Sequence, residues 1–441
     1  MCDSVRSVFD LRRVRQIRII RFVSGRGLGI VPSAMKELDS AGVARLEQFL
    51  ADIGAVLGSA GRRASFATYM LGLLSDGERK SIEPIAARSC PDPKRVEAEH
   101  QRLHHFVANG KWDDRAVRRT AAEHGISAMT SRETVEAWIL DDTGFIKQGT
   151  HSVGVQRQYT GSAGKVTNCQ VGVSLTIATQ TDQLPIDFEL YLGSSWLDDP
   201  ARCLEARIPG DVVFKTKPQL ALEMVRRALD DGVPRGIVLG DSAYGAGGDF
   251  RLALRKFGLH YSLGVHSNTT VFEVGRAINR GGKAIGLRDL AFKLMAKKKF
   301  RRCTWRAGTK VDLTARFAMC RVFPCAEKER EVQEKEPVWL LIEWRDGDSE
   351  PANYFFASLP KSTRRKTLIR LTMQRWRTER VYEDLKGEFG LDHYEGRRFQ
   401  GWHHHVSAVL CCYAFVISER WRHFSPSTTR SLVNYENLVA A

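Results

Sequence analysis

Residues 135–145 are VEAWILDDTGF, an apolar run that ends on two adjacent aspartates and a Thr-Gly pair. A short apolar run bounded by turn residues is typical of a buried β-strand. Three further strand-like segments follow it in the chain, VGVQRQYTG, NCQVGVSLTIATQ and LPIDFELYLG. Segments this close in sequence predict an antiparallel meander that begins at the first strand.

The next segments change the predicted architecture from all-β to mixed α/β. KPQLALEMVRRALDDG is an amphipathic helix, and GIVLGDSAYG is a short buried strand that ends on Asp241. A helix at 249–257 and a strand at 260–265 complete the unit. Antiparallel strands, a helix and then a parallel strand predict a mixed sheet, and the pieces arrive in the order of a ribonuclease-H-like core.

Composition indicates a basic globular protein. The 441 residues include 67 Lys plus Arg against 51 Asp plus Glu, a net charge of +16, and such an excess favours a polyanionic partner, above all nucleic acid. The alternative is a protein that is merely basic. No apolar run reaches the ~18 residues of a membrane span, and nine cysteines without a CxxC pair favour free thiols. We therefore expect a cytoplasmic protein that does not enter a membrane.

Segments on either side of this core suggest five parts. Residues 1–35 form a basic extension without the apolar segment of a signal peptide, and they are either an arm that touches phosphates or the product of a start codon placed before Met35. Residues 36–132 show helical periodicity throughout and predict a helical DNA-binding domain, or else a packed bundle with a charged outside. Residues 133–265 are the first part of the core, and residues 361–430 its last part.

The segment between the two parts of the core, residues 266–360, is too long for a loop and is rich in strand-like stretches. It predicts a β-rich insertion, and it carries the basic run AKKKFRRCTWRAG. Near the end of the chain, GWHHHVSAVLCCYAFVISERW predicts a buried helix. Its consecutive histidines, residues 403–405, point in different helical directions, so we expect them to be structural.

Residues 368–396, LIRLTMQRWRTERVYEDLKGEFGLDHYEG, predict one long helix with a charged stripe. Arg375, Glu379, Glu383 and Lys386 follow one another at intervals of four, four and three residues, which places them on one side of a helix. Such a stripe is often only a ladder of weak surface ion pairs. It gains chemical meaning if other carboxylates lie beside it.

Two aspartates can supply those carboxylates. Asp142 is expected at the carboxyl end of the first strand and Asp241 at the end of the later parallel strand, where the ends of neighbouring strands converge. Either aspartate alone is more often a turn or cap residue. Together with Glu379, they provide the hard oxygen ligands that two Mg²⁺ ions prefer, and two such ions promote phosphodiester cleavage by water or by a DNA 3′-hydroxyl.

The chain resembles the DDE transposases of bacterial insertion sequences, most closely those of the insertion sequence 701 type. The resemblance covers roughly residues 45–413 and rests on LLSDGERKSIEPIA, DDTGFIKQGTHSVGVQRQYTGSAGKVTNCQVGVSL, GDSAYG and RWRTERVYEDLKGEFGLDHYEGR. The wider superfamily carries a Tyr-Arg-Glu-Lys signature on its catalytic helix. Arg375, Glu379 and Lys386 match its spacing, whereas Thr372 stands where the family has tyrosine. The resemblance implies that Arg375 and Lys386 hold phosphates of the transposon end.

Carried over residue by residue, the resemblance assigns the catalytic and metal-binding triad to Asp142, Asp241 and Glu379. Asp141 and Glu383 are the nearest alternatives. The implied cofactor is a pair of Mg²⁺ ions, with Mn²⁺ as a substitute, and the implied partners are the terminal inverted repeats of the element, target DNA and a second copy of the chain.

The resemblance also implies that the β-rich insertion helps to grip the cleaved end. Arg301 and Arg302 are then candidate DNA contacts, and Trp305 is a candidate for stacking on a base. Packing of Trp305 beneath the insertion is an equal alternative. The function implied is DNA cleavage at the element's ends followed by strand transfer. The alternatives are a ribonuclease-H-like nuclease without strand transfer and an inactive derivative that acts as a DNA-binding repressor.

Overall fold

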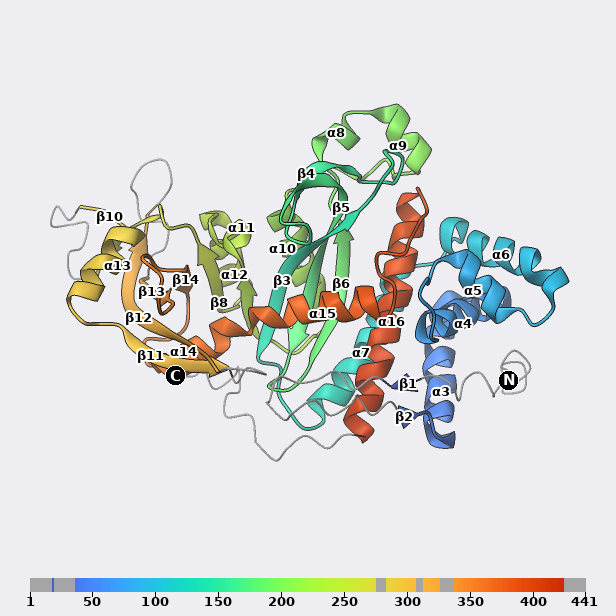
Figure 1. Cartoon of the computed structure of the whole chain (residues 1–441), viewed down its shortest axis with the longest axis horizontal. Coiled ribbons are helices and arrows are strands. Elements are labelled where there is room, and N and C mark those ends of the chain that lie inside the picture. The colour runs from blue at the N-terminus through green and yellow to red at the C-terminus, as the bar shows by residue number, and fades with distance from the viewer. Residues whose placement is uncertain (1–17, 20–35, 275–282, 307–311, 326–335, 424–441) are drawn as a thin grey trace.

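In a computed structural model of the chain, the residues described are 18–19, 36–274, 283–306, 312–325 and 336–423. Within them, twelve strands form one large mixed sheet, and helices lie on its faces and at one side (Figure 1). The predicted mixed α/β class is therefore confirmed. The basic extension at residues 1–35 falls outside the described residues, apart from β1 (Arg18–Ile19), which pairs with β2 (Lys36–Glu37).

The segment before the sheet is helical, as its periodicity predicts, and lies at one side of the molecule (Figure 1). Short polar side chains begin three of its helices, because Asp39, Ser59 and Asp113 each accept a hydrogen bond from a backbone N–H of the first turn. The elements are α3 (Ser40–Leu57), α4 (Ala60–Leu74), α5 (Ile82–Ser89), the 3₁₀ turn η1 (Pro93–Arg95), α6 (Val96–His104), the π turn η2 (His105–Asn109) and α7 (Asp114–Thr130).

The centre of the sheet has the predicted order of antiparallel and parallel strands. β3 pairs antiparallel with β5 and parallel with β7, and β7 pairs parallel with β8. β4 and β6 both pair with β5. The elements are β3 (Ala137–Ile146), β4 (Gln156–Thr160), β5 (Lys165–Ala178), β6 (Gln183–Leu190), α8 (Ser194–Leu197), α9 (Pro200–Ala206), α10 (Lys217–Asp230), β7 (Ile237–Gly240), α11 (Ser242–Gly245), α12 (Gly248–Lys256) and β8 (Tyr261–Val265).

One boundary in this region differs from the prediction. β3 does not end at Asp142 but continues to Ile146, because its pairing with β5 runs unbroken from Ala137 opposite Ala178 to Ile146 opposite Cys169. Asp142 therefore lies within the strand. Apolar content alone places the end of the strand too early, since the ladder of hydrogen bonds to β5 carries it past the two aspartates.

The β-rich insertion is not a separate sheet. Its strand β14 pairs with β8, so the inserted strands extend the central sheet in the order β8, β14, β13, β12, β9, β10, with β11 also on β12. This pairing covers the edge that β8 would otherwise expose. The elements are β9 (Thr270–Glu273), β10 (Ile285–Gly286), α13 (Leu287–Ala296), β11 (Arg301–Arg306), β12 (Leu313–Pro324), β13 (Val338–Trp344) and β14 (Asn353–Ala357).

The predicted long helix at residues 368–396 is divided. α14 (Arg365–Thr372) leads into the 3₁₀ turn η4 (Met373–Arg375), α15 (Trp376–Gly387) follows, and the chain then leaves the helix. Gly390, in the segment after α15, has a left-handed backbone conformation with φ of 67°. A right-handed helix cannot continue through this conformation. α15 crosses in front of the sheet (Figure 1) and contacts β3 and β6.

The last helix, α16 (Phe399–His423), is buried along most of its length and contacts α7, α4 and β6. It joins the helical segment to the sheet. Its three histidines have structural partners: His403 contacts the Phe399 carbonyl and Glu189, His404 the Val107 and Trp112 carbonyls, and His405 the Tyr69 hydroxyl and the Gly390 carbonyl.

Burial lowers the pKa of His405 to about 4, well below the ~6.5 of an exposed histidine. The folded protein therefore resists protonation that the unfolded chain accepts, and stability falls as pH drops from about 6.5 to about 4. We expect His405→Gln to reduce this loss by up to ~1.4 kcal/mol per pH unit. Urea unfolding at pH 7 and pH 5 measures it, with the exposed His151→Gln as control. An unchanged pH dependence in His405→Gln would contradict the assignment.

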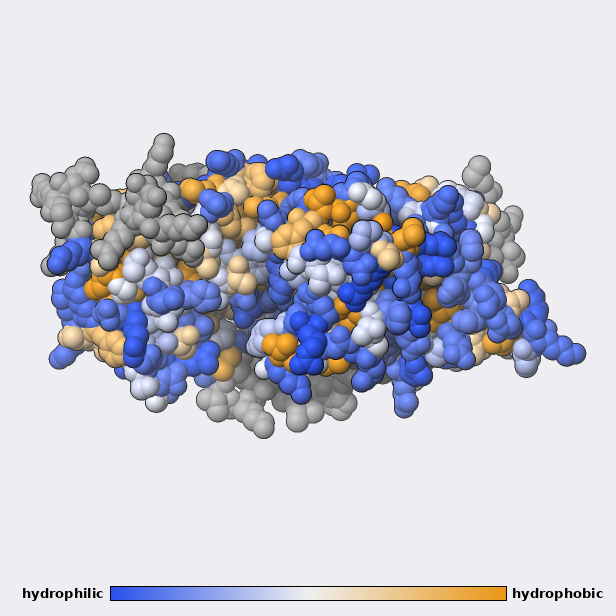
Figure 2. Space-filling view, turned by 90° about the horizontal axis from the view of Figure 1, so that it is seen from above, coloured by the Kyte–Doolittle hydropathy of each residue, from blue (hydrophilic) through white to orange (hydrophobic). Residues whose placement is uncertain are grey.

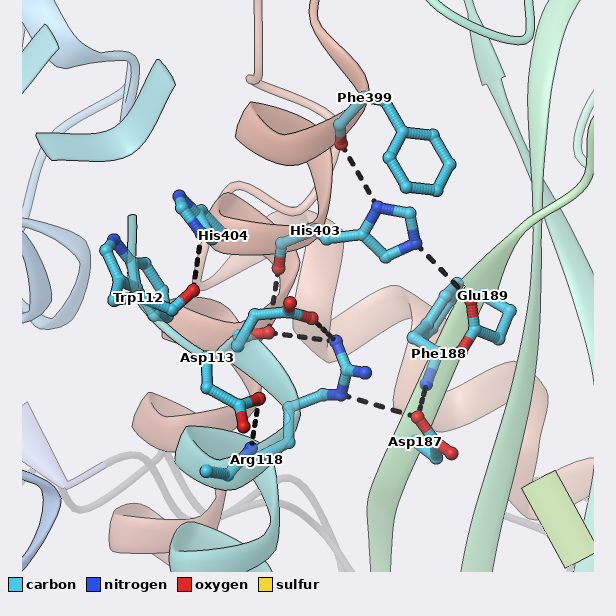
Figure 3. A network of polar contacts seen from close by, with 12 residues as sticks. Trp112, Asp113, Arg118, Asp187, Phe188, Glu189, Phe399, His403 and His404 are labelled. Carbon is cyan, nitrogen blue, oxygen red and sulfur yellow. Dashed lines mark hydrogen bonds and ion pairs between the residues drawn. The ribbon is translucent and has the colours of Figure 1, made fainter. Parts of the chain in front are cut away.

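A buried ionic network joins the same elements (Figure 3). Arg118 of α7 pairs with Asp114 at 2.5 Å and with Asp187 of β6 at 3.3 Å. Arg227 of α10 pairs with both Asp187 and Glu189 at 2.7 Å. Burial alone would raise the pKa of Glu189, but the hydrogen bond from His403 and the two arginines lower it to about 2. Glu189 is thus held ionised between helix and sheet.

No helix in the described part of the chain combines the length and hydrophobicity that a membrane span requires. The face shown in Figure 2 is mostly hydrophilic, with apolar side chains gathered in small patches.

Candidate functional site

The two adjacent aspartates of β3 lie on opposite faces of the sheet. Ala137 and Ile139 pack in the core cluster that contains α14, whereas Trp138 and Leu140 belong to the other cluster. Side chains alternate along a strand, so Asp141 follows Ile139 and Asp142 follows Leu140. Asp141 therefore lies on the α14 face, where Arg375 at the start of α15 pairs with it, and Asp142 lies on the other face, where Lys217 of α10 pairs with it.

Each of these aspartates is paired with one basic side chain. Arg375, the residue before α15, donates to Asp141 at 2.7 Å, and Lys217, the first residue of α10, donates to Asp142 at 3.0 Å. Burial raises the pKa of Asp141 to about 7 although Arg375 opposes the rise. Burial also raises the pKa of Asp142, opposed by Lys217. The site thus holds two carboxyl groups whose negative charge is only partly balanced.

Asp241 lies directly after β7, at the predicted carboxyl end of that strand. Its side chain caps the short helix α11 by accepting from the Ala243 backbone N–H at 2.8 Å. The parallel register pairs Ile139 with Leu239, and two further residues along both strands bring Asp141 level with Asp241. The charge of Asp241 contributes to the raised pKa of both β3 aspartates, so the three carboxyl groups form one electrostatic cluster.

Glu379, one turn into α15, has a side chain that is 62% exposed. Its described contact is with Arg375, at 3.4 Å, and the same guanidinium bonds to Asp141. The described contacts thus link Glu379 to Asp141 and not to Asp142. Glu383, the alternative on the same helix, is 67% exposed and pairs with Arg380 at 3.1 Å.

Lys386, at the far end of α15, is turned toward β3. It donates to the Thr143 hydroxyl and the Gly144 carbonyl, both at 2.8 Å, and to the Ser162 hydroxyl at 3.2 Å. Arg375 and Lys386 therefore flank the β3 aspartates from the two ends of the helix. Thr372, where the family has tyrosine, is buried and hydrogen-bonds the Ser262 hydroxyl at 2.7 Å.

The three insertion residues predicted to touch DNA have other neighbours in the structure. Arg301 donates to the carbonyls of Lys298 and Phe300, and Arg302 pairs with Asp346 at 3.1 Å. Trp305 is partly buried against the core cluster beneath α14. Trp305 thus packs partly against the core, and its stacking on a base stays a prediction.

Two residues at the site were not predicted. Lys217 follows the residue that caps α10, and nothing else in the sequence indicates that it contacts Asp142. Arg306 belongs to the basic run around Trp305, but choosing between neighbours on a strand requires knowing which face is covered. Its guanidinium lies over the ring of Trp376, with Cζ 3.4 Å from the ring centroid, and Trp376 is three residues before Glu379 in the chain.

The donor chemistry of the cluster fits a divalent metal ion. Within the described ranges, no group of three acidic, histidine or cysteine side chains is assembled closely enough to hold one. However, the carboxylates of Asp141, Asp142 and Asp241 are hard oxygen donors. Burial raises the pKa of Asp141 and of Asp142 although Arg375 and Lys217 oppose the rise, so the negative charge of these two carboxylates is only partly balanced. A divalent cation would supply that charge.

Comparisons with known proteins give a family. A family described as "DDE superfamily endonuclease" matches residues 52–311, and one described as "Transposase DDE domain" matches residues 215–415. A probable transposase for insertion sequence element IS701 from Microchaete diplosiphon is 31% identical over 206 residues, which are 46% of this chain and 49% of that protein. The chain thus spans about half the length of this curated relative.

Among solved structures, a synaptic complex of piggyBac transposase with hairpin DNA is similar at a TM-score of 0.40 and 10% identity, over 100% of this chain and 76% of that one. The first family match alone covers more than half of the sequence. This chain therefore belongs to the DDE superfamily of endonucleases.

Proposed function

We propose that this protein is a DNA transposase, which cleaves DNA at the ends of an insertion sequence and joins those ends to target DNA. One observation carries the proposal: the acidic cluster on β3 and β7 lies under a helix whose Arg375 bridges Asp141 and Glu379. Membership of the DDE family and the likeness to a probable insertion sequence transposase support it. The ribonuclease-H-like core is the corresponding proposal for the centre of the sheet.

Asp241 and Glu379 are the proposed metal ligands together with one aspartate of β3. The sequence-based assignment of Asp142 stays a prediction, but Asp141 is better placed, because it shares the α15 face with Glu379. Two divalent ions, Mg²⁺ or Mn²⁺, would activate the attacking hydroxyl and stabilise the leaving oxygen. The chain's own contribution is to hold the carboxylates together and to balance their charge with Arg375 and Lys217 until the ions bind.

Arg375 and Lys386 are proposed to contact the DNA backbone on either side of the cluster. In the structure both side chains are bonded to the protein, so DNA phosphates would compete with Asp141 and Ser162 for their donors. Phosphate is a strong acceptor for charged donors, which makes this exchange favourable.

The remaining parts are assigned by the same proposal. Residues 36–132 form a DNA-binding domain, supported by exposed basic side chains such as Lys94 and Arg95. Residues 133–265 and 361–430 form the catalytic core, and residues 266–360 the insertion. The partners are the inverted repeats, target DNA and a second copy of the chain, and the place of action is the bacterial nucleoid.

The proposal is tested with DNA fragments that carry the two ends of the element, purified protein and Mg²⁺. Cleavage at the ends followed by a covalently joined product is the expected result. Cleavage without joining would instead support a nuclease, and binding without cleavage would support a repressor. Omission of the divalent ion is expected to stop cleavage while binding persists.

Lys386→Ala is expected to lower both end binding and cleavage about tenfold or more, since one charge-assisted bond to phosphate is worth ~1.5–3 kcal/mol. Thermal stability should change little, because the two hydroxyls that Lys386 leaves, those of Thr143 and Ser162, also bond to each other. Filter binding and gel assays measure the effect against Lys366→Ala, an exposed lysine on α14. Equal activity of the two variants would show that Lys386 only fastens α15 to β3.

A further inference from the structure

The guanidinium of Arg306 lies against the indole of Trp376, with Cζ 3.4 Å from the ring centroid. Arg306 is the last residue of β11 and Trp376 is the first of α15, so this contact joins the insertion to the helix that carries Glu379. Trp376 and Glu379 are three residues apart and therefore lie on the same side of the helix. A basic side chain of the insertion thus stands beside the proposed third carboxylate.

An irregularity in β11 places this side chain. Thr304 pairs with Thr314 and Arg306 pairs with Leu313, so the register shifts at Trp305, which is the extra residue of a β-bulge. Bulges bend a strand and re-aim its side chains, and they are frequent beside active sites. Among the described strands, β11 pairs with β12 alone, and it also contacts α14.

The described part of the protein does not use all the donors of Arg306. Its Nε is buried and has no hydrogen-bond partner among the described residues. Burial lowers the pKa of Arg306, and the nearby charge of Glu379 raises it, which shows that the two groups lie close together. Arg377 also approaches the Trp376 ring, at 5.6 Å, but its guanidinium donates to the Gln180 carbonyl and the Gln183 side chain.

The geometry of the stack suits a ligand-binding arginine. A guanidinium that lies flat on an aromatic ring uses its face for the ring and keeps its N–H edges for acceptors in its own plane. Phosphate is the acceptor that this fork matches best, since two parallel N–H donors meet two oxygens. The ring also limits the freedom of the side chain before a ligand arrives, so less entropy is lost on binding.

We infer that Arg306 binds a DNA phosphate close to the bond that is cleaved, and that Trp376 holds its guanidinium in place for this contact. The inference rests on the proposed transposase function and adds to it a residue of the insertion that works at the catalytic helix. The alternative is a purely structural contact, in which Arg306 and Trp376 only hold the insertion against α15.

Two substitutions separate these roles. Arg306→Met keeps a flexible apolar chain against Trp376 and removes the charge, whereas Arg306→Lys keeps the charge. For Arg306→Met we expect end cleavage to fall roughly ten- to hundredfold, as for loss of one charge-assisted contact. The log–log dependence of end binding on salt should become shallower by ~0.9, the value for one phosphate contact. Arg306→Lys should recover part of both.

The control is Arg316→Met, which removes an arginine that lies over Trp344 at 5.7 Å elsewhere in the insertion. It is expected to leave the salt dependence unchanged. Arg306→Met could lower the melting temperature and cleavage together while the salt dependence of end binding stays that of wild type. In that case the contact is purely structural and the inference is wrong. Cleavage by Arg306→Met at the wild-type rate would overturn it equally. If the wild-type protein itself fails to cleave its ends, the proposed function fails, which is a different result from either.

Discussion

Replacing Asp241 with asparagine is expected to abolish metal-dependent cleavage of the element's ends, while binding of those ends stays close to the wild-type level. The substitution removes a ligand charge from the electrostatic cluster with Asp141 and Asp142 but no contact to phosphate. Asn can still accept the cap bond from the Ala243 N–H, so the start of α11 should persist. Gel assays of cleavage and binding, with thermal unfolding of the same samples, measure the three effects.

The same assay decides between the aspartates of β3 and between the glutamates of α15. We expect Asp141→Asn and Glu379→Gln to match Asp241→Asn, because these side chains share the α15 face. Asp142→Asn and Glu383→Gln are the matched controls and should retain cleavage. Loss of cleavage in Asp142→Asn with activity in Asp141→Asn would support the sequence-based triad of Asp142, Asp241 and Glu379. Full cleavage by Asp241→Asn would show that this cluster is not the catalytic site.

Arg118→Met is expected to destabilise the protein by about 3–5 kcal/mol, which is the usual loss when one partner of a buried ion pair is removed. The side chain of Arg118 is 4% exposed and contacts Asp187 (Figure 3). Its removal takes a cation away from Asp187 and from Asp114. Arg227 still serves Asp187, so Asp114 is the more affected of the two. Denaturant unfolding followed by circular dichroism measures the change.

Arg119→Met, at the next position of α7, is the control. Its side chain is 52% exposed, and its ion pairs with Glu123 and Asp231 are 3.7 and 3.6 Å long. Exposed pairs of this kind contribute about 0–1 kcal/mol. A loss in Arg118→Met no larger than in Arg119→Met would mean that water enters the network and replaces the guanidinium.

Local pattern in the sequence was enough for the mixed α/β class and for most elements. Apolar runs with turn residues located β3, β7 and β8, and helical periodicity located α10 and α16. The reason is that the burial of one or both faces of an element determines the spacing of its apolar residues. Consecutive position also sufficed for the histidines of α16, since three neighbours on a helix cannot converge. The family resemblance was likewise carried by motifs, and the family match bears it out.

Relations between distant residues required the tertiary structure. The end of β3 depends on its pairing with β5. The break before α15 is accompanied by a buried hydrogen bond between the hydroxyls of Thr372 and Ser262 on β8, which lies 110 residues earlier in the chain. The insertion extends the central sheet because β14 pairs with the edge of β8. No local sequence pattern predicts this pairing.

The candidate site shows most clearly what the sequence determines and what requires the tertiary structure. The sequence by itself determined that two adjacent aspartates, a third aspartate after a strand and a glutamate on a helix are present at suitable positions. Only the tertiary structure decided which aspartate of β3 shares a face with that helix, since adjacent residues of a strand point to opposite sides. Only the tertiary structure placed Lys217 beside Asp142 and Arg306 beside Trp376 of α15, because these partners are far apart in the chain.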